Sequence, residues 1–134
     1  MKRKQIGPFV LVASFFVICV PLFAHHGGSE YDQKNLLTMK GTVTEFNWSN
    51  PHCQIFLDVT DDKGGVAHWG IETNSISVMT RAGWNRKVIK AGDQVIITVA
   101  PSKKGTPIGL IRKLVLADGR EFSAGSLGER PSEQ

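Results

Sequence analysis

The sequence predicts an all-β protein with one short helix, arranged as an OB-like five-stranded Greek-key barrel over residues 37–122. Two observations support this fold class. Five segments alternate apolar and polar residues, as strands with one buried face do. A short helical pattern lies between the third and fourth segments, and three strands, a helix and two strands form the order of the OB-fold. An antiparallel β-sandwich is the alternative, because alternation alone does not determine topology.

The first strand is expected to begin at Leu37, where the alternation starts. Its inward side carries Leu37, Met39, Gly41 and Val43. Phe46 and Trp48 then break the alternation. We therefore expect a bulge, which inserts one extra residue into a strand, near Glu45 or Asn47.

The second and third strands are expected to form a hairpin after the turn signal Asn50-Pro51. The inward residues of the second strand are Cys53, Ile55, Leu57 and Val59, and its outward residues are His52, Gln54, Phe56 and Asp58. A loop rich in Asp and Gly at residues 61–65 leads into a third strand over Val66 to Glu72. This strand points Ala67, Trp69 and Ile71 inward.

The helix is expected to begin at a cap formed by Asn74 or Ser75 and to end at Gly83, where glycine suits a left-handed conformation. Its apolar residues are Ile76, Val78 and Met79, and Trp84 is expected to fold back onto it.

The remaining elements complete the five strands. A turn at residues 90–93 precedes a strand at 95–99, and a loop at 101–107 precedes a strand at 110–116. A turn then leads into a short return at residues 121–122.

The N-terminal segment has the features of a secretory signal peptide over residues 1–24. Residues 1–4 are basic, residues 6–23 are mostly apolar, and Ala24 is a small residue suited to cleavage. An uncleaved membrane anchor is the alternative, since the apolar run just reaches spanning length. Cleavage predicts a periplasmic or secreted protein without a membrane span.

Two polar segments flank the expected barrel: a flexible arm at residues 25–36 and a disordered tail at residues 123–134. Removing the leader lowers the basic count from 16 to 13 against 12 acidic residues, so the net charge falls from +4 to +1 (13 − 12). A nucleic-acid-binding function is therefore not expected. Cys53 becomes the sole cysteine, which excludes an internal disulfide.

Several motifs together are similar to a known family. They are Ala24-His25-His26, the segment from Gly41 to Phe46 with Trp48, Asn50-Pro51-His52, Trp69 with Glu72, Arg81 to Trp84, Lys90 to Asp93, and Asp118-Gly119-Arg120. This pattern resembles a bacterial exported family known as domain of unknown function 6152. The resemblance implies a small exported β-rich protein and brings no established activity.

The sharpest chemical hypothesis is a metal site made by cleavage after Ala24. The new terminal amine and the imidazole of His25 can close a chelate ring on one ion. A further imidazole from His26 or His52 would give a nitrogen-rich set that suits Cu(II), or less selectively Ni(II) or Zn(II). His68 also faces outward and is a further candidate ligand.

The same histidines fit a simpler interpretation. A His-His pair after a signal peptide can be no more than a soluble cleavable sequence, and His52 can cap the Asn-Pro turn. His68 beside a tryptophan is an ordinary exposed strand residue. Cys53 is expected to be a small buried hydrophobic residue, facing away from His52.

A second functional hypothesis involves three aromatic residues off the core alternation. Phe46, Trp48 and Phe56 would form an exposed apolar patch. In this hypothesis the protein uses no metal and docks on a partner protein of the cell envelope. The sequence contains no Gly-x-Ser-x-Gly, His-Glu-x-x-His or Cys-x-x-Cys motif, so we do not expect an enzyme. A thiol enzyme using Cys53 and His68 is a distant third hypothesis.

Overall fold

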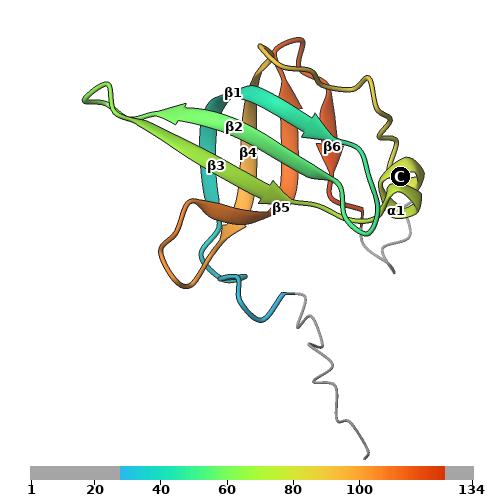
Figure 1. Cartoon of the computed structure of the whole chain (residues 1–134), viewed down its shortest axis with the longest axis horizontal. Coiled ribbons are helices and arrows are strands. Elements are labelled where there is room, and N and C mark those ends of the chain that lie inside the picture. The colour runs from blue at the N-terminus through green and yellow to red at the C-terminus, as the bar shows by residue number, and fades with distance from the viewer. Residues whose placement is uncertain (1–27, 126–134) are drawn as a thin grey trace, which may run out of the picture.

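The computed structural model describes residues 28–125 and shows six strands and one helix in that range (Figure 1). The elements are β1 (Leu37–Asn47), β2 (Gln54–Thr60), β3 (Val66–Glu72), α1 (Ile76–Arg81), β4 (Gln94–Pro101), β5 (Ile108–Leu116) and β6 (Glu121–Ser123). The predicted order of strands and helix is therefore confirmed. The expected signal peptide at residues 1–24 lies outside the described residues.

Five of the strands close into a barrel, as the sequence predicts. The order is β3-β2-β1-β4-β5, with antiparallel neighbours, and β3 also pairs in parallel with β5. That last pairing runs from Gly70 opposite Ile108 to Glu72 opposite Leu110. It joins the two ends of the sheet, which gives the OB-like Greek-key barrel rather than a sandwich. β6 is an additional strand that pairs with β5.

The barrel interior is filled by side chains that alternate along the strands. Residues Cys53, Ile55 and Leu57 are almost fully buried, as the alternation in the second strand predicts. Leu37 is an exception, since it is 38% exposed at the beginning of β1. The core consists mainly of Val43, Ile55, Leu57, Ile71, Met79, Trp84, Ile89, Val95, Ile97, Val99, Ile111 and Leu114.

The expected bulge lies in β1 between Val43 and Glu45, where the register with β2 shifts. After the bulge Phe46 is opposite Ile55, a fully buried residue, and Glu45 is opposite the outward Phe56. Directly opposed residues share a face of the sheet. Phe46 therefore faces the interior, although simple alternation places it outside.

The helix begins after Ser75, but not through the expected cap. The Ser75 side chain makes no capping hydrogen bond, and the Asn74 amide instead donates to the carbonyl oxygen of Ala124. The backbone N–H of Ile76 donates to Oδ1 of Asn50 at 3.1 Å. A residue of the β1–β2 loop thus satisfies one of the free N–H groups of the helix. This contact joins α1 to the loop that carries His52.

Both ends of the described chain are attached to the barrel. Tyr31 is buried and forms an isolated bridge with Ser102, so the expectation of a flexible arm over residues 25–36 is wrong at Tyr31. At the other end, Ser123 belongs to β6 and the N–H of Ala124 donates to the carbonyl oxygen of Arg112. The first residues of the tail expected at 123–134 thus contact the barrel, and residues 126–134 lie outside the described part of the chain. Within residues 28–125, no helix is long and apolar enough to cross a membrane.

The turn before β4 is closed by Asp93. Its Oδ2 accepts a hydrogen bond from the N–H of Lys90 at 2.9 Å, and its Oδ1 pairs with Nζ of Lys90 at 2.8 Å. These hydrogen bonds hold the pKa of Asp93 below its ordinary value. The turn is also attached to β1, because the N–H of Val43 donates to the carbonyl oxygen of Asp93.

Replacing Asp93 with alanine should therefore destabilise the fold in a pH-dependent way. A depressed folded-state pKa stabilises the fold above the unfolded-state pKa, and this contribution disappears as the pH falls through the folded value. We expect a cost of about 1 kcal/mol at neutral pH that shrinks below about pH 4. Urea unfolding at several pH values measures it. Asp93→Asn keeps a side-chain oxygen that can accept from the N–H of Lys90, so it should cost less. A loss in Asp93→Ala that does not change with pH would contradict the role given to the Asp93 carboxylate.

Candidate functional site

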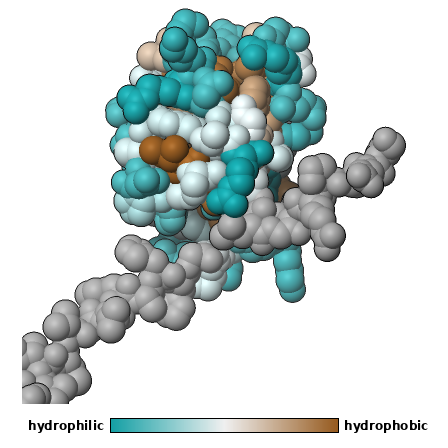
Figure 2. Space-filling view, turned by 90° about the vertical axis from the view of Figure 1, so that its right-hand side faces the viewer, coloured by the Kyte–Doolittle hydropathy of each residue, from teal (hydrophilic) through white to brown (hydrophobic). Residues whose placement is uncertain are grey.

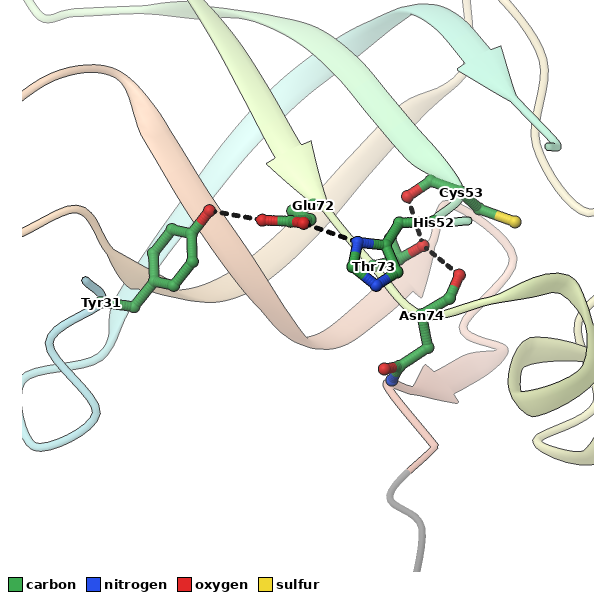
Figure 3. A network of polar contacts seen from close by, with 6 residues as sticks. All are labelled: Tyr31, His52, Cys53, Glu72, Thr73 and Asn74. Carbon is green, nitrogen blue, oxygen red and sulfur yellow. Dashed lines mark hydrogen bonds and ion pairs between the residues drawn. The ribbon is translucent and has the colours of Figure 1, made fainter. Parts of the chain in front are cut away.

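His52 lies at the entrance to β2 and is held by the end of β3. Its Nδ1 is 2.7 Å from Oε1 of Glu72, and its side chain is 46% exposed (Figure 3). The backbone beside it is fixed, because the N–H of Thr73 and its hydroxyl both donate to the carbonyl oxygen of Cys53. The N–H of Cys53 in turn donates to the carbonyl oxygen of Asn74. His52 thus projects from a rigid junction.

Tyr31 bonds the other oxygen of the same carboxylate. Its hydroxyl donates to Oε2 of Glu72 at 2.7 Å, and Figure 3 shows Glu72 lying between Tyr31 and His52. Burial, and then the adjoining carboxylate, raise the pKa of Tyr31, so its hydroxyl stays a proton donor. Three separate parts of the chain meet here: the segment before β1, the β1–β2 loop and the end of β3. We call Tyr31, Glu72 and His52 the Glu72 network.

His68 forms a separate pair. Its Nδ1 is 2.6 Å from Oδ1 of Asp58, its register partner on β2, and its side chain is 81% exposed. Four residues separate His68 from Glu72 along β3, which corresponds to about 13 Å. The structure thus places His68 apart from the Glu72 network, and this geometry does not support the expectation that His68 joins a metal site with His52. Within the described part of the chain, no group of three or more His, Cys, Asp or Glu side chains is arranged to hold a metal ion.

Cys53 is part of the core. It is fully buried, and in Figure 3 its sulfur points away from the His52 ring, as alternation predicts. Burial raises the pKa of the Cys53 thiol, which disfavours the thiolate form that acts as a nucleophile. His68, the partner suggested for a thiol enzyme, pairs with Asp58 instead. The geometry gives the thiol-enzyme hypothesis no support.

The three aromatic residues expected to form one patch are divided between two places. The rings of Phe46 and Trp48 pack edge to face, with their centroids 5.6 Å apart. The centroid of the Phe46 ring also lies 6.2 Å from that of the buried Trp84. Phe56 is on the outward face of β2, opposite Gly70. A shared exposed patch is therefore wrong, because the bulge turns Phe46 inward. The large exposed apolar residues in range 28–125 are Leu36, Leu37, Val66, Ile96 and Ile108. On the face seen in Figure 2, apolar residues gather in small patches separated by hydrophilic ones.

Comparison with known proteins supports the resemblance seen in the motifs. Residues 13–112 match a family of unknown function (DUF6152). The chain belongs to this family. The match includes the whole Glu72 network and ends within β5, short of the resemblance noted as far as Arg120. No curated protein matches this DUF6152 chain.

Two members of the Glu72 network were not assigned a role from sequence. Glu72 is predicted to face outward, but alternation does not reveal which distant side chains reach it. Tyr31 is the only tyrosine of this DUF6152 protein and stands in a polar segment. An isolated aromatic residue in such a segment is the signal that could have indicated a docked position, since a buried tyrosine usually finds a hydrogen-bond partner.

A pocket of about 320 Å³ lies at another part of the surface, between the turn before β4 and the turn after β5. Its charged groups include Lys90 with Asp93 and Arg120 with Asp118. These groups pair with each other at 2.8 Å and 2.9 Å. Among the described residues that line the pocket, Lys87 is therefore the one charged group without an ion-pair partner. The Glu72 network, in which three side chains are joined by hydrogen bonds, is the better candidate site in this DUF6152 member.

Proposed function

We propose that this protein is an exported binding module that holds Cu(II). The ligands in this proposal are the terminal amine and imidazole of His25, created by cleavage after Ala24, together with His26 and His52. His25 and His26 lie outside the described residues. The observation that carries the proposal is the Glu72 network, because it brings the beginning of the described chain to the same carboxylate as His52.

The chain length between Tyr31 and the proposed terminus is compatible with this site. His25 is six positions before Tyr31, and six residues span at most roughly 20 Å when extended. Tyr31 and His52 each lie 2.7 Å from Glu72, on its two different oxygens. Tyr31, which attaches the N-terminal segment to the barrel, thus bonds the same carboxylate as the proposed ligand His52. His68 is not included, since about 13 Å of strand separates it from Glu72.

Nitrogen donors favour Cu(II) over the other available divalent ions, with Ni(II) and Zn(II) as weaker competitors. The proposed work is metal carriage or buffering in the periplasm or outside the cell. The competing function, a metal-free module that docks on an envelope protein, receives less support because its aromatic surface is divided.

The proposal is tested by Cu(II) binding to two forms of the mature protein. One carries the free amine of His25, and in the other this amine is acetylated. We expect the acetylated form to bind at least about tenfold more weakly, because a blocked amine cannot close the ring with the imidazole of His25. Isothermal titration calorimetry with a competing chelator measures the affinities.

Two variants complete this experiment. His52→Ala should weaken Cu(II) binding in the authentic form, whereas His68→Ala is the matched control and should leave it unchanged. Equal affinity of the two terminal forms would remove the proposal. Equal loss in both histidine variants would show that exposed imidazoles bind the ion without a defined site.

A further inference from the structure

We infer that Glu72 is a positioning residue that selects the tautomer of His52, so that Nε2 is the bare nitrogen before any metal ion arrives. This inference rests on the proposed function for its purpose, but its geometry is independent of a bound metal. Glu72 accepts at both oxygens, one from Tyr31 and one from His52.

The hydrogen-bond chemistry determines where the proton lies. A carboxylate only accepts hydrogen bonds, so a 2.7 Å contact with Nδ1 of His52 requires a proton on Nδ1. In a neutral imidazole the other nitrogen, Nε2, then carries none. Within residues 28–125, no group bonds Nε2 of His52. The nitrogen available to a metal ion is therefore the one farther from Glu72 in the ring.

Tyr31 keeps the carboxylate in the orientation that this requires. Its hydroxyl bonds Oε2, which leaves Oε1 directed at His52. Tyr31 itself is buried and is held by backbone contacts, since the N–H of Asp32 donates to the carbonyl oxygen of Pro101. Glu72 thus stands between a fixed donor and an exposed ring, and its orientation does not depend on the metal.

An isosteric change at position 72 should reverse the tautomer. In Glu72→Gln we expect the carboxamide oxygen to accept from the Tyr31 hydroxyl, as Oε2 of Glu72 does in the native protein. The amide NH₂ then faces Nδ1 of His52 and donates to it. This favours the form with the proton on Nε2, the nitrogen proposed to bind the ion.

The second histidine provides an internal control. His68 on β3 makes the same type of contact with Asp58 on β2, but no described tyrosine bonds that carboxylate. Asp58→Asn should alter only the His68 ring and leave His52 and Cu(II) affinity unchanged. Tyr31→Phe keeps the buried ring and removes only the hydroxyl. It should therefore lower the fraction of His52 in the Nδ1–H form less than Glu72→Gln does.

The test is long-range ¹H–¹⁵N correlation NMR of the metal-free mature protein at about pH 8. We expect the Nδ1–H form of His52 in the native protein and mainly the Nε2–H form in Glu72→Gln. Cu(II) affinity of Glu72→Gln should fall roughly tenfold or more, as for changes in groups that orient metal ligands.

An unchanged His52 tautomer in Glu72→Gln would overturn the inference. If the tautomer reverses as expected while the native protein binds no Cu(II), the positioning role of Glu72 stands and the proposed metal function fails. The NMR and binding measurements therefore separate the two ideas.

Discussion

Replacing Trp84 with alanine is expected to lower the free energy of unfolding by about 3–5 kcal/mol. Trp84 is 1% exposed, and its ring centroid lies 5.1 Å from that of Phe122 and 6.2 Å from that of Phe46. Its Nε1 donates to the carbonyl oxygen of Ser123 at 2.7 Å. The substitution would open a cavity between α1, β1 and β6 and leave that oxygen without its donor.

Urea denaturation followed by far-UV circular dichroism measures the Trp84 effect without depending on the lost fluorophore. Trp84→Phe is the matched control, because it keeps much of the ring volume and removes the hydrogen bond. It should cost clearly less than the alanine variant. A loss below about 1 kcal/mol in Trp84→Ala would show that the helix and β6 do not depend on this side chain.

Replacing Gly41 with alanine is expected to cost about 3 kcal/mol, although it adds a single methyl group. A β-carbon at this position would lie 2.5 Å from Cδ1 of Leu57 and 2.9 Å from the backbone oxygen of Asp58. The side chain of Leu57 is buried and the backbone of β2 is held by its neighbours on both sides. Neither can move away without disturbing the barrel.

Gly70→Ala is the matched control for Gly41→Ala. A β-carbon there would meet only the Phe56 ring, at 3.6 Å, which is ordinary contact. Its stability should remain within about 0.5 kcal/mol of the native value. Thermal unfolding of both variants under identical conditions gives the comparison, and similar losses at the two positions would mean that glycine in a strand, rather than crowding, determines the effect.

Most strands of the barrel could be predicted from the sequence, because burial of one face of a strand produces alternating apolar and polar residues. The residues of β2 illustrate this, since Cys53, Ile55 and Leu57 are all inside. The same rule failed at Phe46, because a bulge of one residue reverses the facing of everything after it. Local patterns also placed α1 correctly but could not identify Asn50 as the group that bonds its first turn.

The candidate site was predicted only in part. His52 was recognised because an Asn-Pro turn places it at the start of a strand. Its partners Glu72 and Tyr31 are 20 and 21 positions away, and only the three-dimensional pairing of β2 with β3 and of Tyr31 with Ser102 brings them together. His68 had the same outward facing as His52, but facing alone does not give distance along a strand.

The parallel contact between β3 and β5 has a consequence for behaviour in concentrated solution. An open sheet presents rows of unpaired amide and carbonyl groups at its two borders, on which another molecule can add a strand. In the described chain, the two strands that would form those borders pair with each other over residues 70–72 and 108–110, which leaves only residues 66–69 of β3 without a partner strand on that side. The additional strand β6 spans only Glu121–Ser123 and offers little length for such growth. The architecture thus limits self-association into extended sheets without relying on surface charge.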